Sequence, residues 1–177
     1  IRAGQLGLDT VIVEGDRAGG TCLIRGCIPS KAVIHAATRF EELGAHAGEG
    51  EMGISLPDGP MLNMGELVAW KESIVDKLNT GVETLLKKAG VELVKGWATF
   101  RDGKTCDVGT SEDSVTITAE HVILATGSRA TELPFMPFGG NIISSTEALE
   151  LGELPERLVV IGAGYIGLEL GIAYRKL

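Results

Sequence analysis

The stretch LVVIGAGYIGLELGIAYRKL, residues 158–177, restricts the possible folds more than any other part of the chain. Its first four residues are apolar and predict a short buried strand, and the residues after the glycine turn predict a helix. Between them stand Gly162, Gly164 and Gly167 in the order Gly-x-Gly-x-x-Gly. A glycine triplet alone is weak evidence, and its alternative is a purely packing role. In this context, however, it predicts the opening of a Rossmann-like βαβ unit whose turn holds a dinucleotide pyrophosphate.

The first 14 residues, IRAGQLGLDTVIVE, resemble the second half of another such unit. They predict the end of a helix, a stop at Gly7, and a buried strand from Thr10 to Val13 that leads into Glu14. An acidic residue at this strand end can hydrogen-bond an adenosine ribose, although on its own it is more often a solvated charge. The matching glycine turn normally lies about 20 residues earlier, so we expect the first strand and its glycine turn to be missing before Ile1.

The middle of the chain predicts two helices followed by a β-rich segment. The first helix is expected over about residues 30–43, and a Gly/Pro-rich connection follows over residues 44–60. Apolar residues at three- and four-residue spacing then predict a longer core-packing helix ending at Gly90: Leu67, Ile74, Leu78, Val82, Leu85 and Leu86. The runs VELVKGWATF, KTCDVG and SVTITA predict a small antiparallel meander that returns into a buried strand at residues 122–125.

Together these elements predict an α/β fold with two domains. Residues 1–150 are expected to form a Rossmann-like domain with an inserted helical pair and a small antiparallel β-meander. Residues 139–157 are turn-rich and charged, which fits a domain boundary. Residues 151–177 are expected to begin a second, truncated Rossmann-like domain.

Composition excludes several classes of function. A formal charge of −8 and a pI near 4.9 give no basic surface for nucleic acid. The apolar runs are strand-sized and much shorter than the roughly 20 residues that a membrane span needs. Three cysteines are too few for a secreted disulfide framework. We therefore expect a soluble, globular protein that acts on small molecules or protein partners.

Cys22 and Cys27 lie five positions apart in the glycine-rich segment GGTCLIRGCIPSKA. Pro29 marks a helix start, so Cys27 is expected near a helix N-terminus, where the helix dipole favours a thiolate. Lys31 is four residues further on and would place its ammonium on the same helix face. The pattern indicates a reactive Cys27. A disulfide between the two cysteines would need a distorted turn, which Gly26 can provide.

Two other interpretations of the cysteine pair are a structural pair of buried thiols and half of a zinc site. Zinc sites usually take four nitrogen or sulfur ligands at short paired spacing, and the sequence offers no second pair of that kind. No metal is therefore expected. Cys106 is interpreted as an inert strand residue, and His35, His46 and His121 show no paired metal spacing.

Three motifs, GGTCLIRGCIPSKA, ATGSRATELP and GAGYIGLELG, resemble those of the pyridine nucleotide-disulfide oxidoreductases, and occur in the same order. Within that family the chain most resembles the dihydrolipoamide dehydrogenases. The resemblance implies that Cys22 is the interchange thiol that meets the dithiol substrate and that Cys27 lies against the flavin. It also implies that Lys31 lies beside flavin N5 and that Glu169 pairs with this lysine.

The resemblance further implies two cofactors, FAD and NAD. The positions that match FAD contacts, beside Cys22 and Lys31, are Glu14, Gly19, Gly20, Thr21, Ala98, Thr126, Gly127 and Ser128. The positions that match NAD contacts are Gly162, Gly164, Tyr165, Ile166 and Gly167, with Glu169 near the cofactor interface. One departure concerns Ile24 and Arg25, which stand where the family often has Asn followed by Val or Ile.

The implied reaction is the FAD-dependent oxidation of protein-bound dihydrolipoamide, with NAD as acceptor, through a Cys22–Cys27 redox disulfide. The implied partners are the lipoyl domain of a 2-oxo acid dehydrogenase complex and a second copy in a homodimer, with a cytoplasmic location. The dimer-forming domain and its His/Glu base are expected to lie outside this stretch, which alone should be inactive. The alternatives are a glutathione-, mercury- or trypanothione-reducing relative and a non-catalytic flavin-binding fragment.

Overall fold

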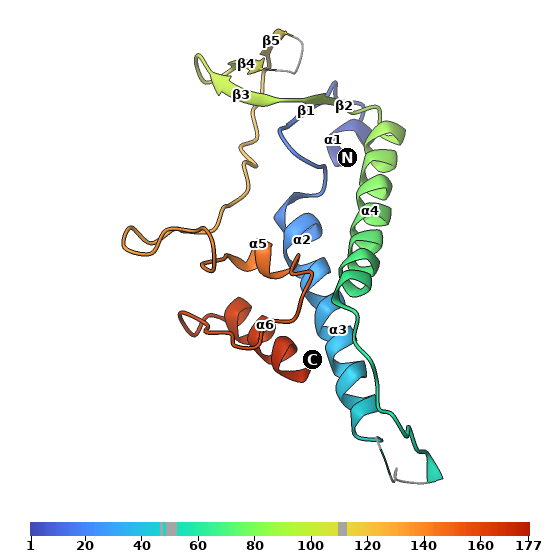
Figure 1. Ribbon diagram of the computed structural model, residues 1–177. Helices are drawn as coiled ribbons and strands as arrows, with labels where there is room; N and C mark the ends of the chain where they lie inside the picture. The colour runs from blue at the N-terminus through green and yellow to red at the C-terminus, as the bar shows by residue number, and fades with distance from the viewer. Residues whose placement is uncertain (47, 49–52, 110–112) are drawn as a thin grey trace. The chain divides into compact units, whose positions relative to one another are not determined.

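The computed structural model describes residues 1–46, 48, 53–109 and 113–177 (Figure 1). The chain divides into two compact units, each made of two separate stretches of sequence. We call Ile1–Gly20 with Lys77–Ser128 the sheet unit, and Thr21–Asp76 with Arg129–Leu177 the helical unit. These units are defined by contacts within the structure, and the division into domains at residues 150 and 151 stays a prediction.

In the sheet unit a short parallel sheet joins the first strand to one much later in the chain. Helix α1 (Arg2–Gln5) precedes β1 (Val11–Glu14), which pairs in parallel with β2 (Glu92–Lys95). The register places Glu14 opposite Lys95. Ala18, Leu86 and Val91 form the small core of this unit, with partly buried Ile12, Val82, Ala89 and Leu93 against them. The predicted first strand is confirmed, although its apolar side chains are only partly covered.

The antiparallel meander consists of β3 (Trp97–Phe100), β4 (Thr105–Gly109) and β5 (Ser114–Thr118), paired in that order. The predicted run VELVKGWATF is therefore divided, because its first half pairs with β1 and only its second half joins the meander. Gly96 is the point of division. Its φ is +155°, and a Cβ there would lie 2.3 Å from the carbonyl oxygen of Gly109, so only glycine fits.

The helical unit is built around α3 (Cys27–Gly44) and α6 (Tyr165–Lys176), which pack against each other. The short helices α2 (Gly20–Arg25) and α5 (Ser145–Ala148) accompany them. The buried core of this unit draws on α3, the start of α4, the end of α5 and α6: Val33, Ala37, Leu67, Leu149, Leu170 and Ala173. Helix α3 begins three residues earlier than the sequence predicts, and the cysteine segment before it is itself helical.

Helix α4 (Met64–Lys88) is the longest element, and the structure confirms the predicted helix and its end before Gly90. The prediction that the apolar residues of this helix pack in the core is only partly correct. Val75 and Leu86 are buried, whereas Leu78 and Leu85 are exposed. The helix also buries Lys71, whose side chain is 3% exposed and pairs with Glu72 at 3.1 Å. The predicted connection over residues 44–60 lies partly outside the described residues.

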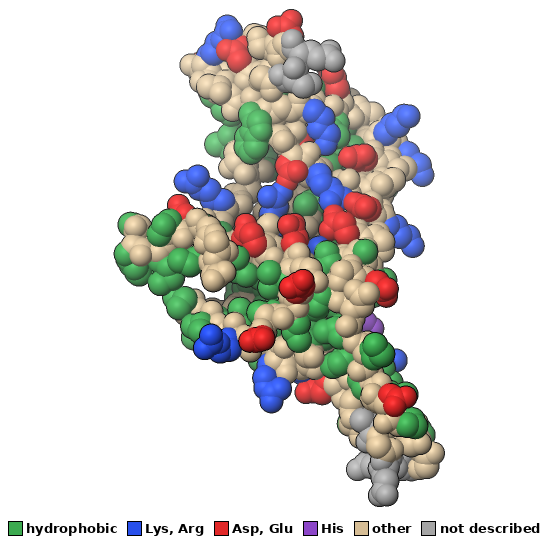
Figure 2. Space-filling model, in the orientation of Figure 1, with side chains coloured by type: hydrophobic (Ala, Val, Ile, Leu, Met, Phe, Trp, Pro, Cys, Tyr) green, Lys and Arg blue, Asp and Glu red, His purple; other side chains and the backbone are tan. Residues whose placement is uncertain are grey.

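Two predicted buried strands are not strands in the structure. Residues 122–125 and 158–161 have no regular secondary structure, and their side chains are exposed, with Ile123 at 86% and Val159 at 79%. Figure 2 shows other apolar side chains gathered over the segment that precedes α5. A strand forms only where a neighbour takes up its backbone N–H and C=O groups, and no described residue pairs with either run.

Candidate functional site

The two cysteines of the glycine-rich segment lie together at the junction of two helices. Cys22 is on α2, Cys27 is the first residue of α3, and both are exposed free thiols. Gly26 separates the helices with φ −132° and ψ −117°. A Cβ on Gly26 would lie 2.8 Å from the Thr21 carbonyl oxygen and 3.1 Å from the Cys22 Cα. The junction can close this tightly only because residue 26 has no side chain.

Hydrogen bonds to Cys27 alter the acidity of the Cys22 thiol. The pKa of the Cys22 thiol is raised above its ordinary value of 9.0, chiefly because its proton is held in a hydrogen bond to the Cys27 sulfur. Partial burial and negative charge on Cys27 raise this pKa further, while the backbone N–H of Cys27, which donates to Cys22, opposes the rise. In the reduced pair the Cys22 thiol therefore holds its proton up to a higher pH than an ordinary thiol.

Cys27 lies at the uncapped N-terminus of α3. No side chain caps this 18-residue helix at Gly26, so the amides of its first turn are not occupied by a capping oxygen. The Ser30 hydroxyl instead donates to the Cys27 carbonyl at 3.2 Å. The positive end of the helix dipole thus lies at Cys27.

Lys31 and Glu169 form an ion pair between α3 and α6. The Lys31 ammonium lies 2.7 Å from one carboxylate oxygen of Glu169 and 2.8 Å from the other. Both side chains keep solvent contact, at 60% and 39% exposure, so the pair adds only about 0–1 kcal/mol to stability. Lys31 also follows Cys27 by one helical turn. The four-residue spacing places Lys31 and Cys27 on the same face of α3.

Further contacts fix α6 against α3. Lys176 lies 2.8 Å from Glu41 and 3.4 Å from the Thr38 hydroxyl, near the other end of α6 from Glu169. The Tyr174 hydroxyl donates to the Ala148 carbonyl at the end of α5, and burial raises the pKa of this phenol. The Lys176 contacts at the end of α6 and the core residues Leu170 and Ala173 hold this helix, and with it Glu169, against α3.

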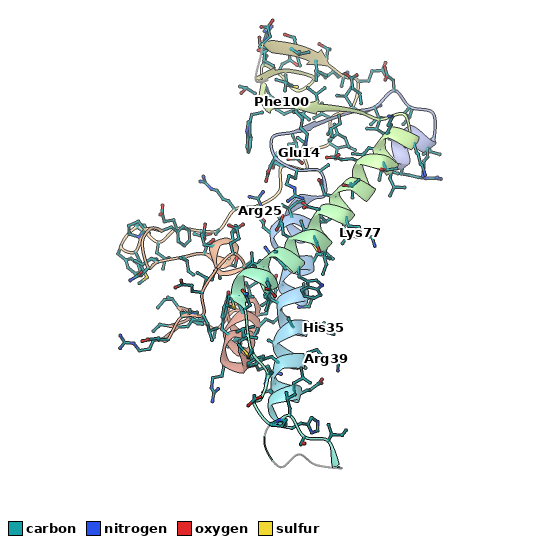
Figure 3. All side chains as sticks on the ribbon, turned by 45° about the vertical axis from the view of Figure 1, so that its right-hand side comes forward. Glu14, Arg25, His35, Arg39, Lys77 and Phe100 are labelled. Atoms are coloured by element: carbon teal, nitrogen blue, oxygen red, sulfur yellow. The ribbon has the colours of Figure 1, made fainter. Side chains whose placement is uncertain are left out.

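In the sheet unit, the residues that resemble FAD contacts lie at the end of β1, in the loops and on β3. Glu14 ends β1 (Figure 3), and its carboxylate accepts the Asp16 backbone N–H at 2.9 Å. Gly19 and Gly20 have φ values of 136° and 72°, and Ala98 lies on β3. Residues 126–128 are exposed and lie outside regular structure, and Gly127 has a φ of 74°.

The second glycine turn allows a close approach between α6 and residues 158–161. Gly162 has a φ of 97°, Gly164 precedes α6 as its N-cap residue, and Tyr165 and Ile166 are exposed in its first turn. A Cβ on Gly167 would lie 2.7 Å from a methyl group of Val160. The third glycine of the motif therefore serves close packing of α6, as the Rossmann pattern requires.

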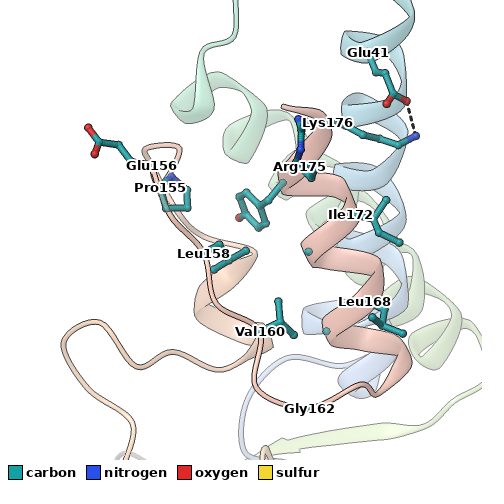
Figure 4. A pocket seen from close by; sticks show the side chains of 13 residues that line it. Glu41, Pro155, Glu156, Leu158, Val160, Gly162, Leu168, Ile172, Arg175 and Lys176 are labelled. Atoms are coloured by element: carbon teal, nitrogen blue, oxygen red, sulfur yellow. Dashed lines mark ion pairs between the residues drawn. The ribbon is translucent and has the colours of Figure 1, made fainter.

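A groove of about 620 Å³ runs between α6 and residues 155–162 (Figure 4). Its lining is mainly apolar, with Leu158, Val160 and Ile172 among the residues that face it, and Lys176 and Glu41 form an ion pair beside it. Two of the turn glycines line it, but Gly164 does not. The groove is an apolar packing surface of α6 and not the phosphate turn itself.

The glycine turns fit the phosphate groups of dinucleotide cofactors. A Cβ at Gly20, Gly162 or Gly164 would meet no atom within 4 Å, so open space lies beside the backbone at each of these positions. Backbone N–H groups that face open space at a helix start can hold phosphate oxygens. The carboxylate of Glu14 likewise fits a ribose hydroxyl.

Neither a cluster of metal ligands nor a membrane-spanning helix is present among the described residues. Within the described ranges, no group of three or more His, Cys, Asp or Glu side chains could hold a metal ion. Among the helices of the described residues, none has the length and apolar character needed to cross a membrane.

Sequence reasoning missed Gly15 and Trp97. The Gly15 Cα lies against the indole ring of Trp97, and a Cβ there would come within 2.5 Å of the ring. The available signals were a glycine directly after Glu14 and a tryptophan directly before Ala98. Neither residue has a pattern of its own, because the contact joins segments about 80 positions apart in the sequence.

The chain belongs to the pyridine nucleotide-disulphide oxidoreductase family, which it matches over residues 1–177. Members of this family use FAD and NAD(H). The chain is 54% identical over 178 residues to dihydrolipoyl dehydrogenase of Pseudomonas aeruginosa and covers 38% of that protein. Dihydrolipoyl dehydrogenases of Geobacillus stearothermophilus and Haloferax volcanii are 49% and 46% identical, with 36% and 37% of their lengths covered. The match covers 98% of this chain for the Geobacillus stearothermophilus enzyme and 100% for the other two.

Solved structures share the fold. LpdA from Mycobacterium tuberculosis superposes with a TM-score of 0.82 at 21% identity, over 99% of this chain and 39% of that one. The flavoprotein disulfide reductase RclA from Escherichia coli, in its Cu(II) complex, gives a TM-score of 0.79 at 23% identity, over 99% and 36%. The chain thus has the FAD-binding, Rossmann-like fold of this family, with mixed helices and strands.

Proposed function

We propose that this chain is the FAD-binding and thiol-bearing part of a dihydrolipoamide dehydrogenase. The observation that carries the proposal is the junction of α2 and α3, where Cys22 and Cys27 exchange hydrogen bonds beside the Lys31–Glu169 pair. Relatives that are 46–54% identical and bear the name dihydrolipoyl dehydrogenase support this choice among the disulfide oxidoreductases. The chain spans less than two fifths of their length, so the activity is assigned to the full-length protein.

The proposed reaction begins with the two cysteines joined as a disulfide. A thiolate of dihydrolipoamide attacks the Cys22 sulfur, and the Cys22–Cys27 bond breaks with Cys27 leaving as thiolate. The second dihydrolipoamide thiol, once deprotonated, attacks the mixed disulfide at the substrate sulfur. This step releases lipoamide and leaves both cysteines reduced. The substrate loses two electrons and two protons, and the cysteine pair gains the two electrons.

The helix start at Cys27 and the ammonium of Lys31 stabilise the departing thiolate. Cys22 regains a proton, in keeping with its raised pKa. FAD, when bound, supplies the chemistry that takes the electron pair from Cys27 to NAD. In this proposal Glu169 sets the position of the Lys31 ammonium.

The cofactor contacts follow the family resemblance. We assign FAD to Glu14, Gly19, Gly20, Thr21, Ala98, Thr126, Gly127 and Ser128, with Cys22 and Lys31 beside the reacting end. We assign the NAD pyrophosphate turn to Gly162, Gly164 and Gly167, with Tyr165, Ile166 and Glu169 near the nicotinamide. Residues 151–177 would then open the NAD-binding domain, and residues 1–150 would belong to the FAD-binding domain.

The proposal extends to partners and location. The substrate would be the lipoyl group carried by a lipoyl domain of a 2-oxo acid dehydrogenase complex. The full-length protein would act as a cytoplasmic homodimer, in which the partner subunit supplies the base that serves these thiols. The strongly acidic composition gives no reason to expect nucleic acid as a partner.

Anaerobic titration of the full-length protein with dihydrolipoamide tests the proposal. The visible spectrum should show flavin reduction and a long-wavelength absorbance that disappears in Cys27→Ser. Cys106→Ser, which alters the buried cysteine of β4, is the matched control and should behave like the unaltered protein.

The titration also separates the alternatives. Flavin that is bound but not reduced by dihydrolipoamide, and is reduced through the same thiols by another dithiol, would identify a different disulfide reductase. Bound flavin that no dithiol reduces would identify a flavin-binding protein without this chemistry.

A further inference from the structure

Asn79 joins helix α4 to the loop that follows β1. Its side-chain amide donates to the Ala18 carbonyl at 2.6 Å, across 61 positions of sequence. The asparagine is half-buried, and Ala18 is 4% exposed and belongs to the core of the sheet unit. Both residues lie within that unit. The bond therefore fastens a buried backbone group of the loop to a long helix.

Asparagine is a poor residue for the interior of a helix, so helix propensity does not account for it here. The Thr84 hydroxyl of the same helix donates to the Thr80 carbonyl at 2.8 Å, and this bond stays within α4. The bond of Asn79 leaves the helix. A buried carbonyl without a donor is costly, and Asn79 supplies the donor for Ala18.

The bond to the Ala18 carbonyl also sets the direction of the next backbone N–H group. A peptide unit is planar and trans, so the Gly19 N–H points away from the Asn79 amide that the carbonyl faces. Gly19 and Gly20 then turn the chain with φ values of 136° and 72°. Two successive glycines can adopt many other conformations, because neither has a Cβ. Asn79 therefore fixes the first peptide of a turn that its own residues leave free.

The earlier part of the loop is held from the two strands of the parallel sheet. The Asp16 N–H donates to the Glu14 carboxylate at 2.9 Å, and the Lys95 ammonium donates to the Asp16 carbonyl at 2.9 Å. These two bonds act three or more residues before the glycine pair. Asn79 acts directly before it.

We propose that Asn79 is a positioning residue of the flavin site, which holds the Gly19–Gly20 turn in the conformation that binds FAD. The inference rests on the proposed function, in which both glycines contact FAD. Asn79 acts through the Ala18 carbonyl and does not touch the cofactor. A turn that is ordered before binding loses less conformational entropy on binding, so the bond contributes to cofactor affinity.

The test measures FAD affinity of the full-length protein stripped of its flavin, from the change in flavin fluorescence on binding. Asn79→Leu has a side chain of similar size that cannot donate. Its FAD affinity should fall by about tenfold, the factor that corresponds to the loss of one such hydrogen bond. Thr84→Val is the matched control, because it removes a hydrogen bond that stays within α4, and its affinity should equal that of the unaltered protein.

Asn79→Asp provides a measurement that a merely structural role would not change. The ionised carboxylate cannot donate to the Ala18 carbonyl, so FAD affinity at neutral pH should fall at least as far as in Asn79→Leu. A protonated carboxyl can donate, and a half-buried position beside a carbonyl favours that form. Lowering the pH to about 5 should bring the affinity of Asn79→Asp back towards that of the unaltered protein at the same pH, whereas Asn79→Leu should stay weak.

Three results would overturn the proposal. Unchanged FAD affinity in Asn79→Leu would show that Asn79 supports only the fold. Equal weakening in Thr84→Val would show general damage to α4. An Asn79→Asp variant that stays as weak as Asn79→Leu at low pH would show that the donated hydrogen is not what matters, and this comparison of pH values decides the question even if Asn79→Leu does not fold. If the unaltered protein binds no FAD at all, the proposed function itself fails, and the role of Asn79 fails with it.

Discussion

Lys31 donates to both carboxylate oxygens of Glu169 across 138 positions of sequence. An exposed ion pair of this kind contributes little to stability, yet its geometry is close to symmetric and its neighbours fix both helices. The same face of α3 carries Cys27 one turn earlier. The role that we propose for the pair is to position a positive charge near the thiol.

Replacing Lys31 should lower the activity of the full-length protein and leave its stability nearly unchanged. In Lys31→Met we expect kcat of the full-length protein to fall on the order of 100-fold, because a positioned charge at a reacting centre is lost. The free energy of unfolding should change by no more than about 1 kcal/mol, since the ion pair is exposed to solvent. Steady-state kinetics and urea unfolding measure the two effects.

Lys176→Met provides the matched control, because Lys176 joins the same two helices through Glu41 but lies away from the thiols. Its kcat should stay near that of the unaltered protein. A similar loss of activity in both variants would mean that Lys31 acts only by holding α6 in place.

The Cys22 thiol should ionise at unusually high pH while Cys27 is present. Its pKa is raised by the hydrogen bond to Cys27, so Cys27→Ala should move the pH midpoint of Cys22 alkylation down towards 9.0. Reduced protein is treated with iodoacetamide across a pH series and digested with trypsin. Cleavage after Arg25 places the two thiols in different peptides.

Cys106 supplies an internal reference for the alkylation experiment. It is buried in β4 and should react more slowly than either exposed cysteine at every pH. An unchanged Cys22 midpoint in Cys27→Ala would contradict the coupling between the two thiols.

Gly26→Ala should disturb the junction that brings the cysteines together. The new Cβ would lie 2.8 Å from the Thr21 carbonyl oxygen, and the backbone must move to accommodate it. We expect a loss of about 1–3 kcal/mol in stability and slower formation of the Cys22–Cys27 disulfide in a glutathione redox buffer.

Gly81→Ala is the contrasting substitution, because a Cβ there meets nothing within 4 Å on helix α4. Better helix propensity should stabilise the protein by about 0.5–1 kcal/mol, with an unchanged rate of disulfide formation. If Gly26→Ala forms the disulfide as fast as Gly81→Ala, the close approach at Gly26 is not what brings the thiols together.

The capping box at the start of α5 should stabilise that helix most at neutral pH. Hydrogen bonds from the Ser144 side chain and backbone hold the pKa of Glu147 below its ordinary value of 4.5. A lowered pKa contributes stability above 4.5 that is lost as the pH falls through the folded-state value. Ser144→Ala should therefore cost roughly 0.5–2 kcal/mol at neutral pH and less in acid.

Amide hydrogen exchange at Ala148 and Leu149 measures this local stability. Glu147→Gln should remove most of the pH dependence and serve as the control. If Ser144→Ala lowers the stability of α5 by the same amount at every pH, the stabilisation comes from the Ser144 hydroxyl cap alone and not from the Glu147 carboxylate.

Local sequence patterns predicted α3, α4, β1 and the meander, because periodicity and turn residues act within short windows. Pairing between distant segments could not be obtained in this way. The parallel partner of β1 begins at Glu92, some 80 residues later, and nothing in VELVKGWATF distinguishes its first half from its second.

The candidate site shows the same difference between residues in local motifs and contacts between distant segments. The thiol segment, Glu14 and the glycine turns stand out in the sequence because each is a contiguous motif. The contact of Gly15 with Trp97 depends on the β1–β2 register and has no local signal. The strands predicted at residues 122–125 and 158–161 show the converse case, where strong local preference is not sufficient without a hydrogen-bonding neighbour.

Those two apolar runs also bear on how this stretch behaves when it is produced alone. Residues 122–125 and 158–161 are exposed, and among the described residues neither run has a strand partner. Exposed apolar segments with unpaired backbone groups tend to pair with other chains. Residues 1–177 expressed on their own should therefore aggregate, and polar substitutions at Ile123 and Val159 should reduce that aggregation.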